Sequence, residues 1–295
     1  MLHLQTFGGL TVSHAERALG GATAQPRRLA LLAVLARVGE RGVSRERLLA
    51  LFWPDEEEER ARRALAQALY ALRRDLGDER AIVGTQELRV DPDAMASDVA
   101  AFAAHVKGGR LAEAAALYAG PFLDGFHLVG APAFERWAEE ERGSLARYHA
   151  RVLERLATAA ERAGRADEAA AHWRALAAAD PLDARVTVRL MEALEATGDR
   201  AGALTQARIY EVLVAQELEL APDSAVLALA ARLRAPPPPA PPAPPTVAAQ
   251  EVEAPTAPVP DAPTPEPAVS APAVSAPAVS EPRAAEAPAV PPPLA

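Results

Sequence analysis

Apolar residues recur at helical spacing in the segment from Arg60 to Gly77, which reads RARRALAQALYALRRDLG. Its leucines fall on one stripe of a helix that advances about 100° per residue: Leu65, Leu69, Leu72 and Leu76. The opposite side, within about 80° by the same arithmetic, carries polar and basic residues: Arg60, Arg63, Gln67, Tyr70 and Arg74. The spacing therefore predicts a helix that packs on a core with one face and presents hydrogen-bond donors with the other.

The segments before this helix predict short strands and two more helices. Leucine and valine alternate with polar residues around a double-glycine break, a pattern typical of two short antiparallel strands within residues 2–12. Pro26 suits a first helical turn, and the apolar face that follows it predicts a helix ending near Gly39. Ser44 is the expected N-cap of a short helix that Pro54 stops.

A β-hairpin is expected directly after the Arg60 helix. Ile82-Val83 and Leu88-Arg89-Val90 flank a polar turn, and Asp91-Pro92 terminates the run. Strands, three helices and a terminal hairpin together predict a winged helix in residues 1–96. In that fold the third helix enters the major groove of DNA, and the hairpin contacts the neighbouring backbone.

Residues 97–234 change to alanine-rich segments with helical periodicity and predict an all-α domain. Two phrases recur with their glycines 34 residues apart, Gly164-Arg-Ala-Asp-Glu-Ala169 and Gly198-Asp-Arg-Ala-Gly-Ala203. That is the tetratricopeptide period. A third phrase, Gly109-Arg-Leu-Ala-Glu-Ala114, is similar but out of register. The pattern predicts stacked, tetratricopeptide-like helix pairs, which bury a continuous core and leave a concave face for a partner.

Residues 235–295 contain 21 of the 28 prolines and no aromatic residue. A segment of this composition cannot bury enough apolar surface to fold, and we expect a disordered Pro/Ala-rich tail or linker. Such a linker also suggests that the chain is the regulatory N-terminal part of a larger signalling protein.

The charge distribution sets the expected strength of DNA binding. The formal net charge is -9, but residues 1–100 carry 14 arginines and 15 acidic residues, so this part is nearly neutral. An acidic run from Asp55 to Glu59 precedes the Arg60 helix, where carboxylates favour a helix N-terminus through its dipole. We therefore expect weak non-specific affinity, and specific binding to double-stranded promoter DNA by a homodimer on repeated half-sites.

Arginine and glutamine carry donors that match base edges in the major groove, whereas further arginines suit phosphates. The expected base contacts are Arg60, Arg63, Gln67 and Tyr70. The expected phosphate contacts are Arg45, Arg47, Arg62, Arg73, Arg74 and Arg89. A merely solvated face is the alternative interpretation, because the chain uses arginine thirty times and lysine once.

Other chemistry is poorly supported by the sequence. The chain has no cysteine, and its six histidines show no metal-ligand spacing. The sequence also lacks phosphate-cradling glycine motifs and a serine elbow, so we expect no enzyme activity, no cofactor and no metal. The longest apolar stretch, Leu29 to Ala36, is far below the roughly 20 residues that span a bilayer, and no signal-peptide pattern opens the chain. A cytoplasmic protein without membrane contact is expected.

Several phrases, taken in order, resemble those of one known family. The N-terminal ones are LQTFGGLTV from Leu4, RRLALLAVLA from Arg27, VSRERLLALFWPD from Val43 and ARRALAQALYALRRDLGD from Ala61. The later ones are Ser97-Asp98-Val99 with Phe102, ALYAGPFLDGF from Ala116, FERWAEEERGSLARYHARVLERLA from Phe134, DPLDARVTVRLMEAL from Asp180 and GDRAGAL from Gly198. The chain resembles the SARP-type bacterial transcriptional activators, which join an OmpR-like winged helix to a bacterial transcriptional activator domain (BTAD).

The resemblance implies a DNA-binding transcriptional regulator, and an activator, whose helical domain self-associates or contacts RNA polymerase or another regulatory protein. The family usually has Glu-Leu-Gly before a proline near the domain end, whereas this chain has Glu217-Leu218-Glu219. The residues leave a second class open, a tetratricopeptide-like protein-interaction module with the winged helix as a structural platform. The predicted fold is mainly α with a small β part: a winged helix-turn-helix in 1–96, tetratricopeptide-like helices in 97–234 and a disordered tail in 235–295.

Overall fold

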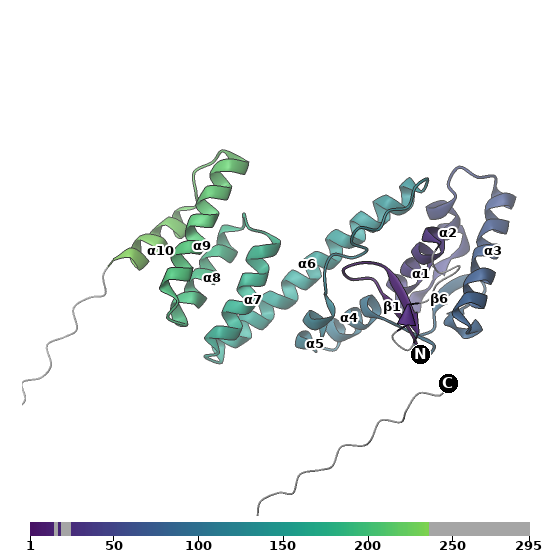
Figure 1. The fold of residues 1–295 in the computed structure, drawn as a ribbon, viewed down its shortest axis with the longest axis horizontal. Helices are drawn as coiled ribbons and strands as arrows, with labels where there is room; N and C mark the ends of the chain where they lie inside the picture. Colours follow the sequence, from purple (N-terminus) through teal and green to yellow (C-terminus); the bar gives the residue numbers. More distant parts are fainter. Residues whose placement is uncertain (15–16, 19–24, 236–295) are drawn as a thin grey trace, which may run out of the picture. The chain divides into compact units, whose positions relative to one another are not determined.

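A computed structural model describes residues 1–14, 17–18 and 25–235 (Figure 1). Its strands are β1 (Leu2–Gln5), β2 (Thr11–His14), β3 (Arg17–Ala18), β4 (Val43–Ser44), β5 (Ile82–Val83), β6 (Glu87–Val90) and β7 (Met95–Ser97). Its α-helices are α1 (Pro26–Val38), α2 (Arg45–Phe52), α3 (Glu58–Leu76), α4 (Asp98–Lys107), α5 (Leu111–Leu117), α6 (Pro132–Arg162), α7 (Ala166–Ala179), α8 (Ala184–Ala196), α9 (Arg200–Leu213) and α10 (Ser224–Arg234). Short 3-10 helices cover Gly39–Arg41 and Glu79–Ala81, and a π-helix covers Val214–Leu218. The predicted disordered tail, apart from Ala235, lies outside the described residues.

The N-terminal strands pair as the alternation predicts. β1 and β2 are antiparallel, with Leu4 opposite Val12, and both side chains are buried. β7 joins the other side of β1 in parallel, so that Leu4 also lies opposite Ser97. β7 was not predicted, because three residues are too few to show alternation and the partner strand is far away in the chain.

The predicted winged helix forms from α1, α2, α3 and the hairpin of β5 and β6. β4, which was not predicted, extends the hairpin to a three-stranded sheet by pairing Val43 with Leu88. Ser44 caps α2 as predicted, because its Oγ accepts a hydrogen bond from the Arg47 backbone N–H at 3.2 Å. α3 begins at Glu58 rather than at Arg60, which extends the helix into the acidic run that its dipole favours.

The three repeated phrases form equivalent turns in the helical part. In each, a glycine with positive φ follows a helix: Gly109 (73°), Gly164 (69°) and Gly198 (84°). The residue after each glycine donates its N–H to the carbonyl five residues earlier at 2.9 Å: Arg110 to His105, Arg165 to Ala160 and Asp199 to Leu194. The alanine that ends each phrase is buried: Ala114, Ala169 and Ala203. The repeat seen in the sequence is therefore a repeat of structure, with Gly109 in the same turn despite its different register.

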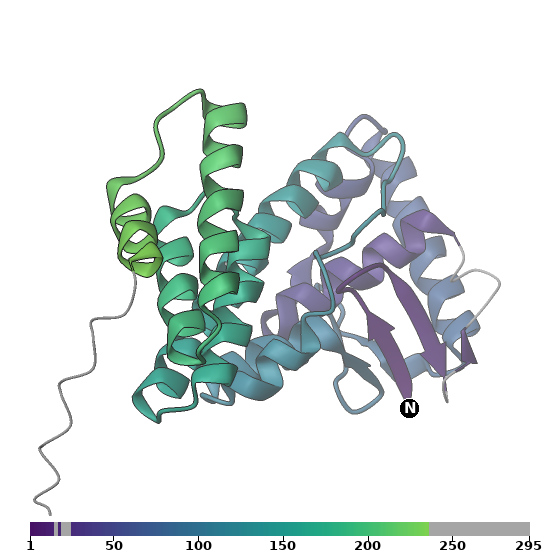
Figure 2. The ribbon, with the colours of Figure 1, turned by 60° about the vertical axis from the view of Figure 1, so that its left-hand side comes forward.

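Two hydrophobic cores fill the described part of the chain. The first runs from Leu2 through the winged helix to Val152, and the second runs from Leu153 to Leu233. Apolar packing continues across the predicted boundary between residues 96 and 97, because the first core includes the rings of Phe102, Phe122 and Phe134. Phe134 of α6 stacks on Phe52 of α2, with the ring centroids 5.3 Å apart. The packing divides within α6, which belongs to both cores. The ribbon shows α6 as one continuous helix (Figures 1 and 2). The boundary at 96 stays a prediction from the sequence.

One carboxylate ties the N-terminal sheet to α4. Asp98 accepts hydrogen bonds from the Thr6 backbone N–H at 2.7 Å, the Thr6 hydroxyl at 2.6 Å and the Phe7 N–H at 2.8 Å. It also accepts from the N–H of Val99 at 2.7 Å. Two phrases far apart in the sequence, around Thr6 and around Asp98, therefore meet in space.

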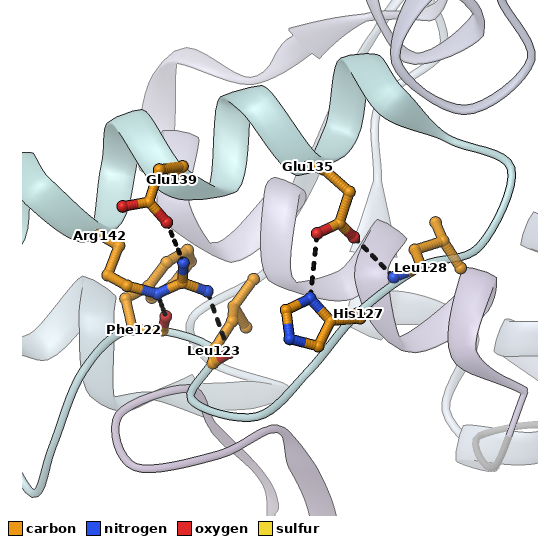
Figure 3. Close-up of polar contacts among 7 residues, drawn as sticks. All are labelled: Phe122, Leu123, His127, Leu128, Glu135, Glu139 and Arg142. Atoms are coloured by element: carbon orange, nitrogen blue, oxygen red, sulfur yellow. Dashed lines mark hydrogen bonds and ion pairs between the residues drawn. The ribbon is translucent and has the colours of Figure 1, made fainter.

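Arg142 of α6 holds the segment between α5 and α6 (Figure 3). Its guanidinium donates to the carbonyl of Phe122 at 3.0 Å and to that of Leu123 at 3.3 Å, and it also pairs with Glu139. The N–H of Leu123 in turn donates to the Thr6 carbonyl at 2.8 Å. The segment therefore packs the N-terminal sheet onto α6.

Glu135 fixes the other end of the same segment (Figure 3). Its carboxylate accepts from the Leu128 N–H at 2.6 Å and lies 3.2 Å from Nδ1 of His127. Nearer α5 the backbones approach closely, because a Cβ at Gly120 would lie 3.0 Å from the Gly8 Cα. Glycine at position 120 allows this approach.

Candidate nucleic-acid interface

α3 packs on the hydrophobic core through its leucine stripe. Leu65, Leu69, Leu72 and Leu76 are all buried, together with the small residues Ala61 and Ala68. Gly77 ends the helix in the left-handed conformation, with a φ of 68°. This packing fixes which face of α3 meets solvent.

The predicted base-contacting residues share that solvent face. Arg60, Arg63 and Gln67 are exposed, and Tyr70 is 70% exposed. The described residues provide no ion pair or hydrogen bond to the side chains of Arg63 and Gln67. The donors of Arg63 and Gln67, about one helical turn apart, are thus available to an outside acceptor.

Two neighbouring arginines are occupied by the acidic run. Arg60 Nε lies 3.1 Å from Glu56, and Arg62 pairs with Glu58 and, at 3.4 Å, with Glu59. Each of these side chains is at least 39% exposed, so each ion pair stabilises the fold little and exchanges readily for another anion. The acidic run therefore reduces the positive charge at the start of α3 without blocking it.

Two of the predicted phosphate contacts have partners in the hairpin. Arg45 Nε donates to the Thr85 carbonyl at 2.6 Å. Arg73, which is half-buried, donates from two nitrogens to the Ile82 carbonyl at 3.3 and 3.1 Å. These two side chains hold the hairpin beside α2 and α3. This role has no signal in the sequence, because the acceptors are backbone carbonyls. Arg47 and Arg89 are exposed.

A shallow hollow of about 380 Å³ lies beside the C-terminal half of α3, lined by Tyr70, Arg73, Arg74 and Glu79. Arg74 Nε is 3.0 Å from Asp75, and that carboxylate also faces Arg28 of α1 at 3.7 Å. Arg28, a half-buried residue that was not predicted as a site residue, thus contacts α3 through Asp75. The hollow combines donors with an aromatic edge, which suits a phosphate and its sugar.

The loop after α3 adds a carboxylate close to this surface. Asp78 accepts hydrogen bonds from the Arg80 backbone N–H at 2.9 Å and from Nε at 3.3 Å. The hydrogen bond from the Arg80 side chain is the main reason that the pKa of Asp78 is lowered. Asp78 is therefore ionised at neutral pH and compensates Arg80.

Within residues 1–14, 17–18 and 25–235 no group of three or more histidine, aspartate or glutamate side chains gathers as a metal site. No helix in that part is long and apolar enough to cross a bilayer.

Two family models match the chain. One, described as "Transcriptional regulatory protein, C terminal", matches residues 21–87, and the other, described as "Bacterial transcriptional activator domain", matches residues 94–234. The first match includes α3, and the second includes α4 to α10. Both models describe transcriptional regulators rather than enzymes.

The fold is also similar to a solved structure, Mycobacterium tuberculosis EmbR in complex with a low affinity phosphopeptide. The TM-score is 0.55 at 22% sequence identity, and the similarity covers 79% of this chain and 64% of the EmbR chain. At that identity the likeness shows the fold alone. No curated protein matches the sequence.

Proposed function

We propose that this chain binds promoter DNA with the exposed face of α3 and activates transcription through its helical domain. The chain belongs to the SARP-type family of transcriptional regulators. The supporting observation is the pair formed by Arg63 and Gln67, which are exposed and without partners among the described residues on a helix whose other face is buried. Their side chains suit guanine and adenine edges respectively. Arg60 and Tyr70, on the same face, extend the base contacts.

Phosphate contacts surround that face in the proposed complex. Arg47, Arg62, Arg74 and Arg89 are exposed and reach the backbone from α2, α3 and the hairpin. Arg45 and Arg73 keep their bonds to the hairpin carbonyls and offer their remaining N–H groups to phosphates.

Specific binding requires two protomers in this proposal. Residues 1–100 are nearly neutral, and Arg60 and Arg62 already face glutamates, so one protomer gains little from counterion release. A homodimer on repeated half-sites adds the contacts of a second α3. Sedimentation of the protein, free and on DNA, tests this step, and a monomer in both samples contradicts it.

The helical domain supplies the protein contacts, either with a second copy or with a component of the transcription machinery such as RNA polymerase. The setting of this function is the cytoplasm, where promoter DNA and polymerase are both accessible. We take activation as the sign of regulation because the second family model describes an activator domain.

The test starts with crosslinking of the protein to DNA across a genome, which supplies the bound sequence. A duplex of that sequence is then titrated with the wild-type chain, Arg63→Ala, Gln67→Ala and Arg174→Ala. Each α3 variant should lose roughly 1–3 kcal/mol of binding free energy. Arg174, an exposed arginine of α7, is the matched control and should change nothing. Arg47→Ala and Arg89→Ala should instead lower the salt dependence by about one unit of slope each.

A protein-interaction module is the second candidate, favoured by the three equivalent turns at Gly109, Gly164 and Gly198. In this case the winged helix is a platform, and the wild-type chain binds no duplex. Equal affinity of the wild-type and Arg63→Ala chains for a recovered sequence would instead contradict a base contact by Arg63.

A further inference from the structure

The C-terminal half of α6 carries a row of exposed arginines that the α3 surface does not include: Arg147, Arg151, Arg155 and Arg162. At about 100° per residue the four lie within about 80° of one another. At 1.5 Å per residue the row is about 22 Å long. Buried residues, among them Val152 and Ala160, lie on the other side of the helix and fix its orientation.

No carboxylate of the described residues neutralises the positive charge of this arginine row. None of the four arginines has an ion pair or a side-chain hydrogen bond to another described residue. The glutamates of the same half of α6 are bound from α8: Arg185 lies 2.5 Å from Glu154, and Arg189 pairs with Glu161. Because α8 neutralises these carboxylates, the arginines of α6 leave a local excess of positive charge.

This excess stands out against the rest of the helical domain. Residues 101–234 carry 16 basic and 19 acidic residues, so a net positive face is not a result of composition. Exposed Glu140 marks its N-terminal limit, and the turn at Gly164 marks its C-terminal limit. Four arginines at one face must repel one another, a cost that an anionic partner would remove.

Tyr148 adds an apolar element to the row. Tyr148 is 44% exposed, and the guanidinium carbon of Arg151 lies 4.3 Å from the centroid of its ring. The contact restrains both side chains before any partner binds. A partner therefore meets an ordered surface with one aromatic side chain among the arginines.

We propose that this face of α6 binds an acidic helical segment of a partner protein. Arg147, Arg151 and Arg155 are about 6 Å apart along the helix axis, the same spacing as glutamates four residues apart on a second helix. Forked guanidinium groups pair well with carboxylates, and an apolar side chain of the partner packs on Tyr148. Duplex DNA fits less well, because its phosphates wind around a cylinder and leave a straight row after a short contact.

This inference rests on the proposed role of the helical domain in protein contacts, and it is independent of base contacts by α3. A failure of the α3 variants to affect DNA binding leaves it standing. Conversely, its own failure leaves DNA binding by α3 unaffected.

The experiment uses the full chain and a labelled synthetic helical peptide. The peptide carries glutamates four residues apart on one face and a leucine beside them, and fluorescence anisotropy measures its binding. A second peptide has the same composition in scrambled order, and a non-specific DNA duplex is the third probe. We expect the ordered peptide to bind best, and the double variant R151E/R155E to weaken it by about tenfold or more, equivalent to about 1.4 kcal/mol.

Two variants make the result specific. R151Q/R155Q removes charge without reversing it and should give a smaller loss, while R174E, an exposed arginine of α7, should leave binding unchanged. Thermal unfolding of each variant verifies the fold. Equal binding of the two peptides, an equal loss in R174E, or an effect of R151E/R155E on the duplex alone would overturn the proposal.

Discussion

Replacing Asp98 by alanine should weaken the junction between the N-terminal sheet and α4. The carboxylate accepts three hydrogen bonds from Thr6 and Phe7, at 2.6 to 2.8 Å. Thr6 and Phe7 are fully buried and Asp98 is half-buried, so bulk water does not reach these donors in the wild-type structure. The variant therefore leaves buried donors without an acceptor.

The expected loss follows from those three donors. A buried donor left unsatisfied costs about 1–3 kcal/mol, and neighbouring losses do not add fully, which gives roughly 3–6 kcal/mol for Asp98→Ala. Asp98→Asn keeps one carbonyl oxygen as acceptor and should lose about 1–3 kcal/mol. Since domains are stable by about 5–15 kcal/mol, the alanine variant should lose a large share of the free energy of unfolding.

Urea unfolding followed by circular dichroism measures these differences. Asp124→Ala is the control, because Asp124 is exposed and has no hydrogen bond to its side chain within the described residues. It should stay within about 0.5 kcal/mol of the wild-type chain. A loss below about 1 kcal/mol for Asp98→Ala would refute the reasoning, because it would mean that the buried donors find other acceptors.

Three further changes test other features of the fold. A fragment of residues 1–96 lacks the rings of Phe102, Phe122 and Phe134, so it should bind a dye for exposed apolar surface and unfold without cooperativity. A fragment of residues 1–163 keeps these rings and should unfold cooperatively. Equal dye binding by the two fragments contradicts a core shared across residue 96. Glu219 has a φ of 55°, a conformation that costs a non-glycine residue about 1–2 kcal/mol. After the entropic cost of glycine in the unfolded chain, Glu219→Gly should raise the melting temperature by about 1–3 °C. Glu219→Ala keeps the unfavourable φ and should not raise the melting temperature. Burial lowers the pKa of His149, so the folded state prefers the neutral ring and the free energy of unfolding should fall as pH drops below about 6.5. The melting temperatures at pH 7.5 and 5.5 measure this loss. His149→Gln should make the melting temperature less dependent on pH.

The fold was predictable where its signals are local. Ser44 as an N-cap and the leucine stripe of α3 act within one helix, and the structure has both. β4 and β7 were missed because each is very short and exists only through a partner strand elsewhere in the chain. The continuity of the first core past residue 96 is likewise a property of contacts between distant segments.

The candidate site shows the same division. Helical periodicity was enough to place Arg63, Gln67 and Tyr70 on one exposed face. The ion pair between Glu58 and Arg62 was also within reach of the sequence, since glutamate four residues before arginine is a favourable helical spacing. The bond from Arg73 to the Ile82 carbonyl was not, because it depends on how the hairpin folds back on α3.

The membership of α6 in both cores couples the helical repeats mechanically to the winged helix and constrains how the protein can evolve. A displacement of the helical repeats acts on a continuous helix of 31 residues rather than on a flexible linker, and it reaches α2 where Phe134 stacks on Phe52. Exchange of the winged helix between relatives must therefore include residues up to about 152 to keep complementary rings together. The unit that recombination can move is therefore larger than the unit that we propose to contact DNA.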